Sequence, residues 1–81
     1  MKDQKAILHR CLKNDEPAFV IAGHDSFAIE TMEAYKSIAE KHGAEEDFLN
    51  DMQLVIDEMK QFQEEEPEKV RIPKTKHERN E

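Results

Sequence analysis

A single strand-like run, residues 18–22, is the feature that most constrains how this chain can fold. The run reads Ala-Phe-Val-Ile-Ala, lies between Pro17 and Gly23, and has the β-branched and aromatic content typical of a short strand. No second such run occurs in the sequence, and an unpaired strand leaves backbone N–H and C=O groups without partners. We therefore expect this run to pair with the same run of a second subunit. The alternative is a buried extended segment.

The length of the chain also points to self-association. A chain of 81 residues forms at most one domain, and its core is marginal because a short chain buries a small share of its surface. Disulfides, metals or self-association usually supply the missing stability. Cys11 is the only cysteine, so no disulfide can form within the chain. A homodimer or a higher homo-oligomer is therefore expected.

Apolar residues at helical spacing account for most of the remaining sequence. The expected helices cover residues 3–13, 26–42 and 44–65. Gly43 is placed to end the second helix in the left-handed conformation, and the methionines and phenylalanines of the stripes, such as Met52 and Phe48, are expected to pack in the core. The expected fold class is mainly α: three helices with one short β-strand that pairs between subunits.

Charge divides the chain into an acidic body and a basic tail. Residues 1–66 carry 7 Lys/Arg and 16 Asp/Glu, a net charge of −9, whereas residues 67–81 carry 5 and 3, a net charge of +2. We expect one small helical domain over 1–66 and a flexible tail over 67–81. The acidic body disfavours duplex DNA as a partner. No apolar run reaches the roughly 20 residues that cross a membrane, so a soluble, cytoplasmic protein without a membrane partner is expected.

The turn between the strand-like run and the second helix is the best candidate for a binding site. His24 can donate to a polar or anionic group, and Asp25 can accept from a hydroxyl or a base edge, close to free helix N–H groups. Ser26 lies beside them, and Tyr35 is a possible helper. The structural alternative is that Asp25 or Ser26 caps the helix while His24 is an ordinary surface residue.

The sequence contains no pattern that predicts a catalytic or metal-binding site. It contains no glycine-rich phosphate loop, no nucleophile elbow and no Cys-x-x-Cys motif. His9 and Cys11 are two residues apart on a helix, so their side chains point to different faces and do not form a metal pair. We therefore expect no catalytic residue, no metal site and no cofactor, and a protein that is not an enzyme.

Residues 16–28 resemble a pattern found in small helical proteins encoded by bacteriophages and mobile elements. In that pattern, Glu-Pro and an apolar strand lead to a polar turn that ends in Asp, followed by a helix of about this length. This chain departs from the pattern at residues 22–24, where Ala-Gly-His replaces a stretch richer in Arg and Gln. The resemblance implies an anti-defence role in a phage, either by sequestering a nucleotide signal in oligomers or by blocking a host protein.

These observations lead to three hypotheses about function. The leading one is a small homo-oligomeric binding protein that holds a nucleotide-type signal near His24, Asp25 and Ser26, with Tyr35 or basic groups of the tail as helpers. The second is an acidic interaction module or inhibitor that uses the third helix to mimic nucleic acid and occupy a basic protein surface. The third is a structural accessory subunit.

Overall fold

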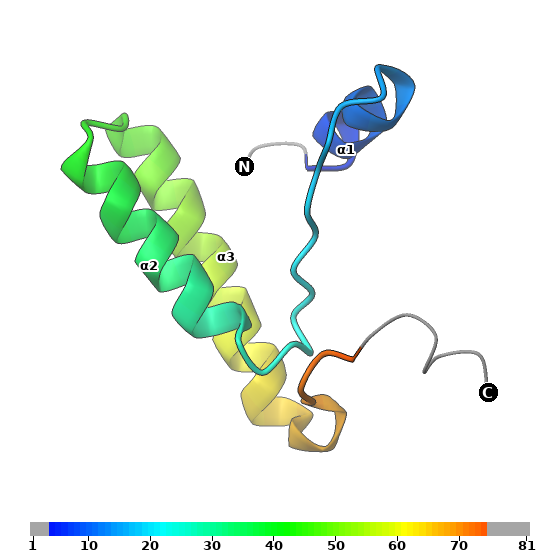
Figure 1. The fold of residues 1–81 in the computed structure, drawn as a ribbon. Helices are drawn as coiled ribbons and strands as arrows, with labels where there is room; N and C mark the ends of the chain where they lie inside the picture. Colours follow the sequence, from blue (N-terminus) through cyan, green and yellow to red (C-terminus); the bar gives the residue numbers. More distant parts are fainter. Residues whose placement is uncertain (1–3, 75–81) are drawn as a thin grey trace.

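The computed structural model describes residues 4–74, which form three α-helices and one short 3-10 helix (Figure 1). Their bounds are α1 (Gln4–Lys13), α2 (Ala28–Lys41), α3 (Glu46–Glu65) and η1 (Pro67–Lys69). The expectation of a mainly helical chain with three helices is confirmed, and each α-helix begins and ends within two residues of its expected range.

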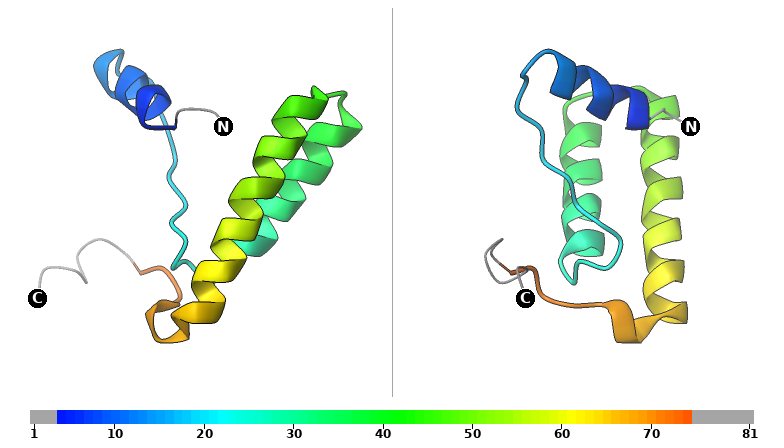
Figure 2. Two further views of the ribbon diagram at one scale, coloured as in Figure 1. Left: turned by 180° about the vertical axis from the view of Figure 1, so that it is seen from behind. Right: turned by 90° about the vertical axis from the view of Figure 1, so that its right-hand side faces the viewer.

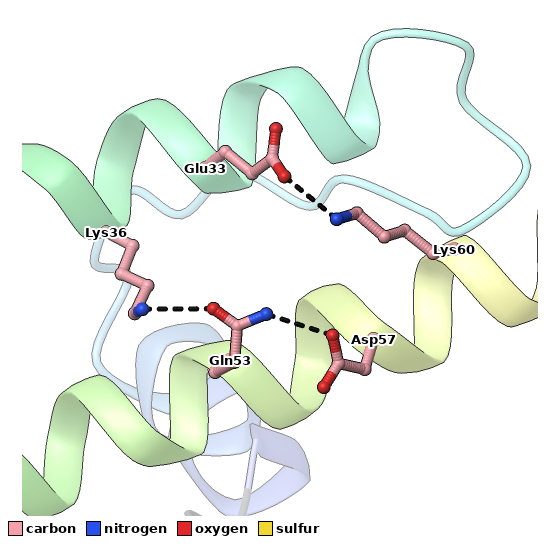
Figure 3. A network of polar contacts seen from close by, with 5 residues as sticks. All are labelled: Glu33, Lys36, Gln53, Asp57 and Lys60. Atoms are coloured by element: carbon pink, nitrogen blue, oxygen red, sulfur yellow. Dashed lines mark hydrogen bonds and ion pairs between the residues drawn. The ribbon is translucent and has the colours of Figure 1, made fainter.

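Helices α2 and α3 form an antiparallel helical hairpin, which holds most of the small core (Figure 1). In the hairpin Ala28, Met52 and Ile56 are buried, and in α1 only Cys11 is buried. Polar contacts also join the two helices. Glu33 forms an ion pair with Lys60 (3.1 Å), and the Lys36 ammonium donates to the side-chain oxygen of Gln53 (3.0 Å), as Figure 3 shows. An exposed ion pair such as that of Glu33 and Lys60 contributes about 0–1 kcal/mol, so apolar packing holds the hairpin together.

The ends of α1 and α2 are closed by the same backbone arrangement. After α2, Gly43 has a φ of 83°, and the N–H of Ala44 donates to the carbonyl of Ala39 over 3.0 Å. After α1, Asp15 has a φ of 55°, and the N–H of Glu16 donates to the carbonyl of Cys11 over 2.8 Å. Both are Schellman motifs, in which one left-handed residue lets the chain satisfy free carbonyls at the helix end. The expected role of Gly43 is confirmed.

The strand-like run at 18–22 forms no strand among the described residues. It is an extended stretch that links α1 to the turn before α2 (Figure 1), with Phe19 87% and Val20 67% exposed. The alternative of a buried segment is therefore wrong for the single chain. The physical reason is that a strand requires a hydrogen-bonded neighbour, and within the described residues the one bridge joins Asp25 to Arg71 instead.

The described chain has an open, V-like shape. We call residues 4–22 the arm, because α1 and the extended stretch stand away from the hairpin and α1 does not pack helix against helix on α2 or α3 (Figures 1 and 2). The radius of gyration is 14.4 Å. A compact chain of this length would have a value of about 12 Å. The arm therefore exposes apolar surface that a compact fold would bury.

The start of the expected tail contacts the body of the protein. Helix η1 follows α3 directly, and Arg71 forms the bridge to Asp25. The expected flexibility of residues 75–81 lies outside the described residues.

Candidate functional site

The turn at residues 23–26 is held from two sides by hydrogen bonds. From α3, the side-chain amide of Gln63 donates to the backbone carbonyls of Gly23 (2.9 Å) and Asp25 (3.0 Å). From the segment after η1, the N–H of Arg71 donates to the carbonyl of His24 (2.9 Å), and the N–H of Ser26 donates to the carbonyl of Arg71 (2.9 Å). These contacts give the turn a defined backbone conformation and bring Arg71 next to the predicted site.

Asp25 has a local structural role in this turn. Its carboxylate oxygen Oδ1 accepts from the N–H of Phe27 over 2.7 Å, which is an Asx-turn. Helix α2 begins one residue later and has no side-chain capping bond, so the expected helix cap by Asp25 or Ser26 is not formed. The side chains of His24 and Ser26 are exposed, so the polar groups that this turn presents to solvent are mainly theirs.

Tyr35 lies apart from the other three predicted site residues. It is seven residues beyond the start of α2, which corresponds to about 10 Å along the helix. Its ring meets the ring of Phe48 edge-on, with centroids 6.3 Å apart and an interplanar angle of 71°. The structure therefore brings His24, Asp25 and Ser26 together in the turn, whereas Tyr35 belongs to a different surface.

That surface is an apolar hollow between the arm and the hairpin. Its volume is about 510 Å³, and residues from all three helices and from the extended stretch line it. The arm contributes Cys11 and residues 18–21, and the hairpin contributes Tyr35, Phe48 and Met52 among others. The volume falls within the roughly 300–1,000 Å³ typical of ligand pockets, and the lining is mostly apolar. The hollow is thus a second candidate binding surface on the described chain, beside the turn.

The hollow corrects one part of the expected core. The stripe of Phe48, Met52, Val55 and Met59 was expected to pack inside the protein, yet only Met52 of these four is buried. The other three are half-buried and face the hollow. The sequence carries a signal for this surface, because Leu49 and Ile56 widen the apolar face of α3 beyond what one neighbouring helix covers.

Comparisons of the chain with protein-family models, with curated proteins and with solved structures found no match. Among residues 4–74, no group of three or more His, Cys, Asp or Glu side chains is arranged to hold a metal ion. In the same part of the chain, no helix combines the length and the apolar character needed to span a bilayer. Clues to function therefore come from the geometry of the turn and the hollow.

Proposed function

We propose that this protein is a non-enzymatic, homo-oligomeric binding protein whose subunits associate through the arm. The observation that supports this function is the exposure of Phe19 and Val20 at the edge of an open apolar hollow. Contiguous apolar surface of this kind marks interaction sites in small proteins. Burying one such side chain contributes about 1.5–3 kcal/mol, and a symmetric dimer gains that contribution twice.

The backbone of residues 18–22 supports association by strand pairing. Within the described chain, none of these five N–H groups donates to another backbone carbonyl. A free, extended edge with β-branched and aromatic side chains is a template for a second strand. In the proposed assembly the two copies of this segment pair antiparallel across a two-fold axis, which satisfies the backbone groups of both.

Sedimentation velocity at micromolar concentration tests the proposed assembly. We expect the wild-type chain to sediment as a dimer or a larger oligomer. Val20→Pro should dissociate it, because proline removes a donor from the ladder, whereas Val20→Ile keeps the donor and should leave the assembly intact. A wild-type chain that sediments as a monomer would contradict the proposal.

A small anionic ligand, such as a nucleotide-type signal, is the candidate for the turn at 23–26. Arg71 supports it, because the backbone bridge to Asp25 holds this cationic residue against the turn that carries the exposed side chains of His24 and Ser26. The anti-defence role implied by the resemblance to phage proteins fits such a ligand. The acidic carboxylate of Asp25 in the same turn disfavours a bare anion, so a hydrogen-bonding base or ribose would be needed as well.

Calorimetric titration with a panel of nucleotides tests the ligand proposal. Arg71→Gln and His24→Ala should each weaken binding about tenfold without loss of helicity, because each removes a charged or hydrogen-bonding contact. Lys41→Gln, at the other end of the hairpin, is the matched control and should bind like the wild type. If no nucleotide binds, the turn is structural.

The acidic face of α3 remains the alternative binding surface. This helix carries seven Asp/Glu and one Lys, a net charge of −6. The two lysine contacts of the hairpin lie between the helices: Lys60 pairs with Glu33 of α2, and Lys36 donates to Gln53 of α3. Neither contact is an ion pair with an acidic residue of α3. A basic protein partner held by this face would bind much more weakly at high salt, whereas association through the arm would change little.

A further inference from the structure

We infer that, in the assembled protein, the apolar hollow of each subunit is filled by the Phe19 side chain of a second copy. This inference rests on the proposed self-association. Insertion of Phe19 would be the contact that makes the association of two copies specific. The hollow and the exposed ring lie on the same chain, so one two-fold axis can place each ring in the other subunit's hollow. Such a contact is self-complementary, as a two-fold interface requires.

The geometry of strand pairing leads to this placement. If two copies of residues 18–22 pair antiparallel about Val20, Phe19 of one copy lies directly opposite Ile21 of the other. Residues directly opposite each other share one face of the ribbon, with Cβ atoms roughly 4.5–5.5 Å apart. Ile21 and the chain's own Phe19 both line the hollow. Strand pairing therefore places the partner's Phe19 beside the wall of the hollow that Ile21 lines.

Size and exposure favour a side chain of this type as the occupant. Phe19 is 87% exposed, the highest value among the exposed large apolar residues of the described chain. The hollow, at about 510 Å³, has ample room for an aromatic ring and is lined by Met52 and Val55 of α3. Aromatic rings in apolar pockets are the usual energetic centres of protein interfaces.

Charge favours a second copy over an unrelated partner. Helix α1 carries Lys5, Arg10 and Lys13 and no acidic residue, and none of these three cations forms an ion pair within the described chain. Helix α3 has a net charge of −6. Strand pairing brings the basic arm of each subunit toward the acidic hairpin of the other, which offsets the repulsion between two acidic bodies.

Disulfide trapping between differently tagged copies tests the placement of Phe19. Both copies carry Cys11→Ala; one also carries Phe19→Cys and the other Val55→Cys. Mild oxidation of the mixture should link tagged to untagged chains, and a reductant should reverse the link. Leu54→Cys in place of Val55→Cys is the control, because Leu54 neighbours Val55 on α3 but is 51% exposed and does not line the hollow. That pair should not link.

A chain that carries Phe19→Cys and Val55→Cys together separates the inference from the proposed function. If this chain sediments as an oligomer but links only within itself, Phe19 closes its own hollow. The inference is then wrong, while self-association stands. If the chain and the wild type both sediment as monomers, the proposed function fails as well.

Two solution measurements probe the same contact without cysteines. Phe19→Ala should raise the dissociation constant of the dimer at least tenfold, whereas Phe27→Ala, which removes a half-exposed ring outside the hollow, should change it less than threefold. The naphthalene dye ANS should bind the Phe19→Ala chain and not the wild-type dimer. Stoichiometric dye binding to the wild-type dimer would show a hollow open to small apolar ligands and would overturn the inference.

Discussion

The two glycines of this chain have opposite conformational demands. Gly43 has a φ of 83°, a backbone conformation that costs free energy for any residue with a Cβ atom. Space is not the constraint there, because a Cβ at this position would meet no atom within 4 Å. Gly23 does not have a positive φ, and a Cβ there would lie 3.6 Å from the Phe62 ring, an ordinary contact. The difference between these residues is therefore one of backbone conformation, not of space.

We therefore expect Gly43→Ala to lower the free energy of unfolding by about 1 kcal/mol. Gly23→Ala should be neutral or should raise it by up to about 1 kcal/mol, because alanine restricts the unfolded chain. Urea unfolding followed by circular dichroism measures both at equal protein concentration. Equal destabilisation by the two changes would contradict the left-handed closure of α2.

Gln63 holds the turn at 23–26 to the end of α3 through two hydrogen bonds to backbone carbonyls. Gln63→Ala should lower the free energy of unfolding by about 1–3 kcal/mol, because it leaves the part-buried carbonyl of Gly23 without its donor. The carbonyl of Asp25 loses one of its two donors and keeps the N–H of Ala28 (2.9 Å). Gln61→Ala is a matched control, since Gln61 makes only an exposed contact with Glu65 (3.0 Å), and should change it by less than about 0.5 kcal/mol. Hydrogen exchange at Asp25 and Ser26 should rise only in the Gln63 variant.

At the scale of elements, α3 presents three different environments along one helix. Met52 is buried at the floor of the hollow's lining, Val55 lines the same hollow but is half-buried, and Glu58 is exposed. A charge introduced at each position therefore meets a different penalty, because an unpaired charge is costly only where water is excluded.

The three positions yield a graded prediction. Met52→Asp should unfold the hairpin, Val55→Asp should leave a folded chain that no longer self-associates, and Glu58→Gln should be silent. Circular dichroism measures folding, and sedimentation measures association. Retained helicity in Met52→Asp, or unfolding in Glu58→Gln, would show that the packing face of α3 lies elsewhere.

At the scale of the whole molecule, the proposed self-association predicts that stability depends on protein concentration. A single chain buries four apolar side chains among its described residues, so the proposed self-association would add a large share of apolar burial. We expect the melting temperature of the wild type to rise by several degrees between about 1 and 100 µM, because mass action favours the associated form. The Val20→Pro chain should melt at a lower temperature that does not depend on concentration. A wild-type melting temperature that is constant over this range would argue for a stable monomer.

The helices follow from local sequence. Apolar spacing over 44–65, the stop at Pro67 and the left-handed Gly43 depend on neighbours a few residues away, so the pattern alone predicts them. Whether residues 18–22 form a strand depends on a hydrogen-bonding partner outside the local chain. The sequence indicates that such a partner is needed but not where it lies.

Other features depend on residues that are far apart in the sequence. They are the hydrogen bonds of Gln63 and Arg71 to the turn, the distance between Tyr35 and His24, and the lining of the hollow. Only the tertiary structure decides such contacts, because they depend on how the arm, the hairpin and the C-terminal segment are placed in space.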